Sequence, residues 1–156
     1  LKARNKLEVS ELFIFDVPEI IGDDTNGHID NLVRFIDSNT ILYFASKDVS
    51  YQNYQLACKL EEQIENIMSK SKIIKNAIPI YHDKNDELVI NNKIHPYSKL
   101  NFIATKNMFI FPCLEKNKNS IELQIKSLPI NAPLYTLKCE AALLEYGGLH
   151  CLTANI

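Results

Sequence analysis

One arrangement of apolar residues occurs twice along the chain and restricts its fold more than any other feature. Two β-rich segments, an amphipathic helix and a third β-rich segment follow one another over residues 28–81, and a similar layout returns over residues 101–139. Alternation of strands with helices predicts an α/β fold. The second occurrence predicts an internal structural repeat with little sequence identity between its copies.

The first copy contains the clearest helix. It is predicted over about residues 51–71, with Ser50 as its N-cap, because apolar side chains recur on one face at Leu56, Leu60, Ile64 and Ile67. Asp37-Ser38-Asn39 has the composition of a hairpin turn between the first two strands. The strands of this copy are predicted at Ile29–Ile36, Thr40–Ala45 and Ile73–Tyr81.

The second copy is shorter. Lys106-Asn107 predicts a two-residue hairpin loop between strands at Phe102–Thr105 and Met108–Pro112. A short helical stripe follows, formed by Ile121, Ile125 and Leu128, and then a strand at Leu134–Cys139. Outside the two copies, further strands are predicted at Leu12–Val17, at Glu87–Ile90, and after Gly147-Gly148 in the terminal segment Ala141–Ile156.

Length and charge narrow the classes of function. The 156 residues suit one domain, since domains run to roughly 100–200 residues. The 17 Lys and Arg residues are balanced by 19 Asp and Glu residues, for a net charge of −2. This balance lacks the basic field that nucleic acid attracts, so no nucleic-acid partner is expected. No apolar run approaches the roughly 20 residues of a membrane helix, so no membrane association is expected.

The spacing of the cysteines and the surroundings of two histidines predict neither disulfides nor a metal site. The four cysteines are isolated in a chain large enough to fold without disulfides, which predicts reduced thiols and a cytoplasmic protein. Zinc sites use close-spaced ligand pairs, and no such pair of cysteines is present, so no metal site is expected. His82 and His95 lie in polar segments and are predicted to be surface histidines.

Two short segments carry residues suited to covalent catalysis. His28 and Asp30 would project from the same side of an extended chain, although such a pair is also common on solvated strand edges. Gly147 and Gly148 would permit a sharp turn and a close approach of the backbone to a ligand, placing Cys151 at the start of a strand. A buried cysteine after a tight turn is the alternative. A thiol becomes nucleophilic as its thiolate, which a nearby imidazole favours.

Three blocks together resemble the agmatine deiminases and the bacterial peptidylarginine deiminase-like proteins of the guanidine-modifying, or pentein, superfamily. The segment from Gly22 to Asp30, followed by Arg34-Phe35, is similar to the Asp-x-x-Gly-His-x-Asp block of that family. Tyr97-Ser98-Lys99-Leu100-Asn101-Phe102 is similar to its Tyr-x-x-x-Asn-Phe hairpin. Gly147-Gly148-Leu149-His150-Cys151 is similar to its Gly-Gly-x-x-His-Cys terminus, one residue tighter than in many members.

The resemblance implies a fold and a set of roles. The fold would be part of a pentein αβ-propeller, built of ββαβ modules around a pseudo-fivefold axis, with the active site in the central channel. Cys151 would be the nucleophile that attacks the guanidinium carbon, and His28 the general acid and base. Asp30 would bind guanidinium nitrogens, and Gly147 and Gly148 would contact the substrate through the backbone. No cofactor is implied.

The chain also departs from the family pattern. It has no tryptophan, and the family's upstream Trp-x-Arg-Asp and Glu-Gly-Gly-like segments are missing. Together with a first residue that is Leu1 rather than Met, this suggests that residues 1–156 are the C-terminal portion of a single deiminase domain. The N-terminal half of the same enzyme is then an expected partner, without which the fragment would be inactive. Many family members are homodimers, so the resemblance also implies a homodimer.

The implied reaction is hydrolysis of a guanidinium group to a ureido product and ammonia. The first expectation for the substrate is agmatine, converted to N-carbamoylputrescine in polyamine biosynthesis. Free arginine and peptidyl-arginine remain alternatives. An amidinotransferase or a dimethylarginine hydrolase fits the terminal block less well. A noncatalytic binding protein with this fold is a further alternative, against which the joint presence of His28, Asp30 and Cys151 argues.

Overall fold

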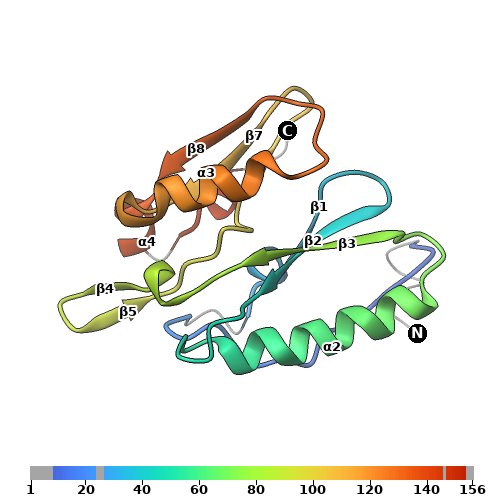
Figure 1. Cartoon of the computed structure of the whole chain (residues 1–156), viewed down its shortest axis with the longest axis horizontal. Coiled ribbons are helices and arrows are strands. Elements are labelled where there is room, and N and C mark those ends of the chain that lie inside the picture. The colour runs from blue at the N-terminus through green and yellow to red at the C-terminus, as the bar shows by residue number, and fades with distance from the viewer. Residues whose placement is uncertain (1–8, 24–26, 146, 154–156) are drawn as a thin grey trace.

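A three-stranded sheet with one long helix forms the first half of the fold. The computed structural model describes residues 9–23, 27–145 and 147–153. The strands β1 (Val33–Phe35), β2 (Thr40–Ala45) and β3 (Asn76–Tyr81) lie in the order β1-β2-β3, with β1 antiparallel and β3 parallel to β2. The helix α2 (Tyr54–Lys70) connects β2 to β3 and packs on this sheet (Figure 1).

The second half repeats this topology. The strands β6 (Ile103–Ala104), β7 (Phe109–Cys113) and β8 (Leu134–Lys138) lie in the order β6-β7-β8, again antiparallel and then parallel. The helix α3 (Lys118–Lys126), preceded by the 3₁₀ turn η3 (Glu115–Asn117), packs against β8. The two ββαβ units confirm the predicted internal repeat and the α/β class.

A hairpin lies between the two units, and only its first strand, at Glu87–Ile90, was predicted. The 3₁₀ turn η2 (Lys84–Asp86) precedes β4 (Leu88–Ile90), which pairs antiparallel with β5 (Lys93–His95). Asn91 and Asn92 connect these strands with φ values of 51° and 61°. Asparagine tolerates this left-handed conformation well, and two such residues form the tight turn that suits a hairpin. The Asn-Asn pair was therefore the available sequence signal.

The core is shared between the units. Every residue of β2 is buried, and α2 buries Leu56, Leu60, Ile64 and Ile67 against this sheet, as the helical spacing predicts. Phe102 and Phe111 of the second unit belong to the same apolar cluster, with ring centroids 4.8 Å apart. At roughly 1.5–3 kcal/mol for each large apolar side chain that is fully buried, this common core holds the two units together.

Several local predictions were wrong, the first of them at Leu12–Val17. This segment is not a strand in the structure. Its Asp16 backbone donates to Oε1 of Gln63 (2.9 Å) and accepts from Nε2 of the same side chain (2.6 Å), while Phe13 and Phe15 pack on the core. The backbone N–H and carbonyl of Asp16 are thus hydrogen-bonded to a side chain of α2 instead of to a neighbouring strand.

The start of α2 and the second hairpin loop also differ from prediction. Ser50 does not cap the helix, whose N-cap is Asn53, and the Asn53 Oδ1 atom accepts from the backbone N–H of Ile21 at 2.8 Å. The loop between β6 and β7 spans residues 105–108, because Ala104 pairs with Phe109. It is closed by the Thr105 N–H donating to the Met108 carbonyl at 3.0 Å.

The chain ends without the predicted terminal strand in its described part. A short helix α4 (Glu140–Leu144) leads to the 3₁₀ turn η4 (His150–Leu152). A second 3₁₀ turn, η1 (Ile29–Asn31), takes the place of the first residues of the strand predicted at Ile29–Ile36. Among the described residues, the longest helices fall short of the length and apolarity needed to cross a membrane.

Candidate active site

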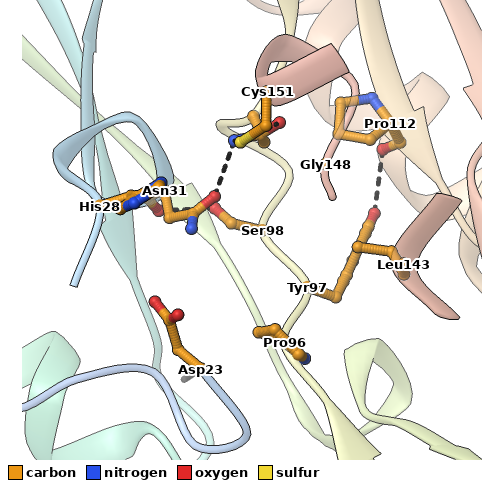
Figure 2. Close-up of a pocket in the computed structure, with 11 residues that line it drawn as sticks. Asp23, His28, Asn31, Pro96, Tyr97, Ser98, Pro112, Leu143, Gly148 and Cys151 are labelled. Carbon is orange, nitrogen blue, oxygen red and sulfur yellow. Dashed lines mark hydrogen bonds between the residues drawn. The ribbon is translucent and has the colours of Figure 1, made fainter. Parts of the chain in front are cut away.

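A small cavity lies where the two units and the C-terminal turn meet (Figure 2). Its volume is about 70 Å³. The turn η1, the segment after β5 and the turn η4 all contribute to its wall. Its described lining consists of Asp23, His28, Asn31, Pro96, Tyr97, Ser98, Asn101, Pro112, Leu143, Gly148 and Cys151.

The structure brings together the three residues predicted to be catalytic. One ligand-type atom from each of His28, Asp30 and Cys151 lies within 4.8 Å of the other two. The local backbone that places His28 near Asp30 differs from the predicted strand. It is the 3₁₀ turn η1, in which the Asn31 N–H donates to the His28 carbonyl at 3.1 Å. The two-residue alternation of a strand is therefore not what places His28 near Asp30.

Asp30 is held by three neighbouring side chains. Its Oδ2 atom lies 2.6 Å from Nδ1 of His150 and accepts from Nδ2 of Asn101 at 3.2 Å. The Sγ atom of Cys151 lies 3.7 Å from the same oxygen. Hydrogen bonds to charged groups contribute more than neutral ones, about 1.5–3 kcal/mol each, so His150 and Asn101 fix the orientation of this carboxylate.

Asn101 makes hydrogen bonds to residues of both turns that form the site, η1 and η4. Its Nδ2 group lies 2.8 Å from Oδ1 of Asn31 and 3.4 Å from Sγ of Cys151, within donor reach of both. Its Oδ1 atom accepts from the backbone N–H of His150 at 2.8 Å. The amide thereby ties η1 to η4 and directs a polar N–H at the thiol. We refer to His28, Asp30, Asn101, His150 and Cys151 as the site cluster.

The two glycines before Cys151 differ in what lies against them. A Cβ atom at Gly148 would lie 2.1 Å from Oδ1 of Asn101, so only glycine permits this close approach. Gly147 does not line the cavity, and a Cβ there would contact Leu152 at 3.2 Å. Neither has a positive φ, which among described glycines is found at Gly22 and Gly27. The close approach is thus to a site side chain, and Cys151 lies on η4 instead of at the start of a strand.

A half-buried cation, Arg34, lies near Asp30 and Cys151. Arg34 stacks over the ring of Phe102 at 4.5 Å and donates from Nη1 to the Phe102 carbonyl at 3.0 Å. Burial lowers the pKa of Arg34, while the charges of Asp30 and Cys151 raise it. Arginine stays protonated in proteins, so Arg34 supplies a positive charge close to Asp30 and Cys151.

The same three groups are ligand types that zinc accepts. A thiolate, an imidazole and a carboxylate can coordinate Zn²⁺, and His28, Asp30 and Cys151 are the group of this kind among the described residues. Structural zinc sites use four protein ligands, whereas Asp30 here is engaged by His150 and Asn101. The arrangement therefore matches a nucleophile with its base better than a structural metal centre.

His82 and His95 are not surface residues as predicted, because both are buried. His82 accepts from the backbone N–H of Lys99 at Nε2 (3.0 Å), and its Nδ1 lies 2.9 Å from the Ile80 carbonyl. Its ring stacks on Phe44 with centroids 4.0 Å apart. Burial lowers the pKa of His82 well below its ordinary value, and the charge of Lys99 lowers it further.

This histidine belongs to a second polar cluster, which is enclosed. Lys99 pairs with Asp86 at 2.8 Å, and both side chains are only 2% exposed. Nζ of Lys99 also donates to the Tyr81 carbonyl at 2.7 Å, and Asn117 donates to Oδ1 of Asp86 at 2.6 Å. We refer to His82, Asp86, Tyr97, Lys99 and Asn117 as the buried cluster.

The site thus places the exposed thiol of Cys151 beside a carboxylate and an imidazole, and comparison with known proteins identifies the family of the chain. The profile of the Porphyromonas-type peptidyl-arginine deiminases matches residues 2–156. The chain therefore belongs to that family.

Individual relatives are distant and longer. The "Putative agmatine deiminase" of Shewanella baltica (strain OS195) is 22% identical over 169 residues, which cover 98% of this chain and 45% of that protein. The chain thus spans less than half the length of the curated relatives it matches. Among solved structures, the substrate-bound C. jejuni agmatine deiminase has a TM-score of 0.80 at 24% identity, with 96% of this chain and 43% of that one covered. The "Putative Arginine Deiminase" of Porphyromonas gingivalis has a TM-score of 0.85 at 24% identity, covering 99% and 45%. These similarities show the fold.

Residue-level reasoning missed two members of the site cluster. His150 and Asn101 were named only as parts of sequence blocks, with no role assigned to either. The available signal was their position inside two of the three blocks that resemble the deiminases. Their contacts with Asp30 join residues 71 and 120 positions apart in sequence, which spacing along the chain does not reveal.

Proposed function

We propose that this chain supplies the nucleophile, the general acid and base, and one substrate-binding carboxylate of a guanidine-hydrolysing enzyme. The preferred substrate is agmatine, converted to N-carbamoylputrescine and ammonia, as polyamine biosynthesis requires. The observation that carries the proposal is the convergence of His28, Asp30 and Cys151 within 4.8 Å at a cavity. Membership of the deiminase family supports the same reaction class.

The first step forms a bond between sulfur and carbon. The thiolate of Cys151 attacks the central carbon of the guanidinium, while Asp30 binds guanidinium nitrogens. A planar cation with several N–H donors suits a carboxylate. His28 gives a proton to the departing nitrogen, the C–N bond breaks, and ammonia leaves. The substrate remains attached to sulfur as a thiouronium group.

The second step releases the product. Water attacks the thiouronium carbon, and His28 takes one of its protons. The tetrahedral adduct then collapses with cleavage of the C–S bond, and the remaining hydroxyl proton passes to solvent. The ureido product leaves and the thiolate of Cys151 is regenerated. Dividing one difficult displacement into two easier ones is the benefit of covalent catalysis. The N–H of Asn101 lies 3.4 Å from Sγ, within reach of the sulfur both as attacking group and as leaving group.

We also propose that residues 1–156 form the C-terminal portion of a single deiminase domain, part of a pentein propeller of ββαβ modules. Two observations support this proposal. The ββαβ topology is repeated, and the chain covers less than half of the length of the relatives it matches. Further carboxylates that complete the guanidinium site would then come from the N-terminal half of the same enzyme.

The proposal is tested by assaying ureido product from agmatine, free arginine and an arginyl peptide with the full-length gene product. A kcat/KM for agmatine at least tenfold above the others supports agmatine as the substrate. A preference for arginine or the peptide supports the corresponding alternative deiminase. The absence of ureido product from all three contradicts catalysis and favours a noncatalytic binding protein.

A further inference from the structure

Two imidazoles lie at the site, and the chemistry proposed above uses one of them. His28 lines the cavity together with Cys151, whereas His150 is not among the described residues that line it. Nδ1 of His150 instead lies 2.6 Å from Oδ2 of Asp30, with the two side chains 36% and 16% exposed. His150 thus contacts the carboxylate and not the space that a substrate would occupy.

The two oxygens of the Asp30 carboxylate have different surroundings. His150 and Asn101 both contact Oδ2, and Sγ of Cys151 lies 3.7 Å from the same atom. Within the described part of the chain, no hydrogen bond is formed to Oδ1. An ionised carboxylate accepts hydrogen bonds at both oxygens. Oδ1 is therefore the oxygen left for a guanidinium nitrogen.

The backbone of His150 is itself held in place. Its N–H donates to the side-chain Oδ1 of Asn101 at 2.8 Å and to the Asn101 carbonyl at 3.2 Å. Its carbonyl accepts from Oγ1 of Thr153 at 2.8 Å. Because His150 and Cys151 are consecutive in η4, one short turn carries both the nucleophile and the ring that contacts Asp30. The contact therefore fixes the carboxylate relative to the thiol.

We propose that His150 is a positioning residue that donates from Nδ1 to Oδ2 of Asp30 and thereby directs Oδ1 at the guanidinium of the substrate. The inference rests on the proposed guanidine hydrolysis and adds one residue to its substrate-binding machinery. Nδ1 carries a hydrogen both in one neutral tautomer and in the protonated ring, so either form can donate. Proton transfer to and from the substrate remains with His28.

Two substitutions separate the N–H of His150 from its bulk. Asparagine carries an amide group one bond from Cγ, where histidine has Nδ1, whereas leucine has the same branching without a donor. We would measure the Kd of agmatine for the full-length gene product carrying Cys151→Ala, which binds without turnover. Adding His150→Leu should raise this Kd about 10- to 150-fold, the range for a hydrogen bond to a charged group. Adding His150→Asn should raise it about threefold at most, because a donor remains.

A second background tests whether His150 acts through Asp30. Once Asp30→Ala has removed the carboxylate, adding His150→Leu should have no further effect on the Kd, since residues that share one interaction are non-additive. Thr153→Ala is the matched control, because it removes a hydrogen bond to the same turn without touching Asp30. It should leave the Kd unchanged.

Turnover in the presence of Cys151 distinguishes positioning from proton transfer. An amide does not transfer protons, so His150→Asn should keep the kcat of the wild type and its pH profile. A loss of kcat in His150→Asn as large as that in His28→Ala would overturn the inference. An unchanged Kd in His150→Leu, or an equal loss with and without Asp30, would also overturn it. If the wild type forms no ureido product from agmatine, the proposed function itself fails and this inference fails with it.

Discussion

The site cluster and the buried cluster lie on two sides of one segment, residues 97–101, and differ in almost every physical respect. Tyr97 and Lys99 direct their side chains into the buried cluster, where Lys99 and Asp86 are each 2% exposed. Ser98 and Asn101 point the other way and donate to Asn31 at its backbone and side-chain oxygens. One segment thus supplies both a closed structural network and an open reactive one.

The two clusters differ in how tightly their polar groups are enclosed and hydrogen-bonded. In the buried cluster each charge is paired and hydrogen-bonded, and burial raises the pKa of Tyr97 well above its ordinary range, so its hydroxyl remains a donor to the Pro112 carbonyl at 3.0 Å. In the site cluster Cys151 is exposed and its contacts are long, 3.4 Å to Asn101 and 3.7 Å to Asp30. The first network is closed to solvent, whereas the second leaves the thiol of Cys151 accessible.

The largest expected effect is on turnover and falls on the site side. Cys151→Ala in the full-length gene product should abolish ureido formation, because no other group in the site cluster can attack the guanidinium carbon. Its thermal unfolding should match that of the wild type, since the thiol is exposed. Cys58→Ala, which removes an exposed thiol on α2, is the control. Residual activity within tenfold of the wild type would exclude Cys151 as the nucleophile.

The second effect concerns proton transfer at the same site. His28→Ala should lower kcat by about 10²–10⁴-fold, the usual contribution of a general acid or base. Stability should change little, because His28 is exposed. Steady-state kinetics with agmatine provide the measurement, and an unchanged kcat would refute the assignment.

The third prediction concerns the buried cluster, where a substitution should lower the free energy of unfolding and leave ureido formation unchanged. Lys99→Met leaves Asp86 as an unpaired buried charge and should lower the free energy of unfolding by about 3–5 kcal/mol. Adding Asp86→Asn should recover part of this loss, because it removes the charge. Urea denaturation measures both. Lys138→Met breaks an exposed pair with Glu115 and should cost at most about 1 kcal/mol; equal losses at the two pairs would contradict the contrast.

The smallest effect is a pH dependence of stability. Burial holds the pKa of His82 well below its ordinary value, so as pH falls below about 6.5 the unfolded chain binds a proton that the folded chain does not. The free energy of unfolding should therefore decrease with falling pH, by up to about 1.4 kcal/mol per pH unit. His82→Gln should remove this slope between about pH 6.5 and pH 5.5, the range just below the ordinary histidine pKa. The exposed His28→Gln should retain it, and a slope that survives His82→Gln would show that another group is responsible.

Sequence patterns predicted the elements whose side chains repeat with a clear period. The face of α2 with Leu56 to Ile67 and the strand at β2 were predicted correctly, because burial there follows local spacing. Leu12–Val17 was wrong because its backbone groups are satisfied by Gln63, 47 residues away. His82 was misjudged because its polar sequence neighbours resemble a surface loop, although Asp86 among them is buried with Lys99.

The sequence predicted which residues lie at the site better than it predicted how they are arranged. His28, Asp30 and Cys151 were selected from resemblance to the deiminases, and the structure brings them together. Their roles remain proposals. The reason given for placing His28 beside Asp30 was a strand, where the structure has a 3₁₀ turn. The links through Asn101 and His150 could not be predicted, since they depend on tertiary contacts between distant segments.

The central claim is that Cys151 forms a covalent bond with the guanidinium carbon of the substrate. Mass spectrometry of the full-length gene product, quenched with acid during agmatine turnover, tests it directly. The account predicts that the peptide containing Cys151 carries agmatine less one ammonia, and that the peptide containing the exposed Cys58 does not. Ureido product formed without any adduct on Cys151, and equally well by Cys151→Ala, would contradict it.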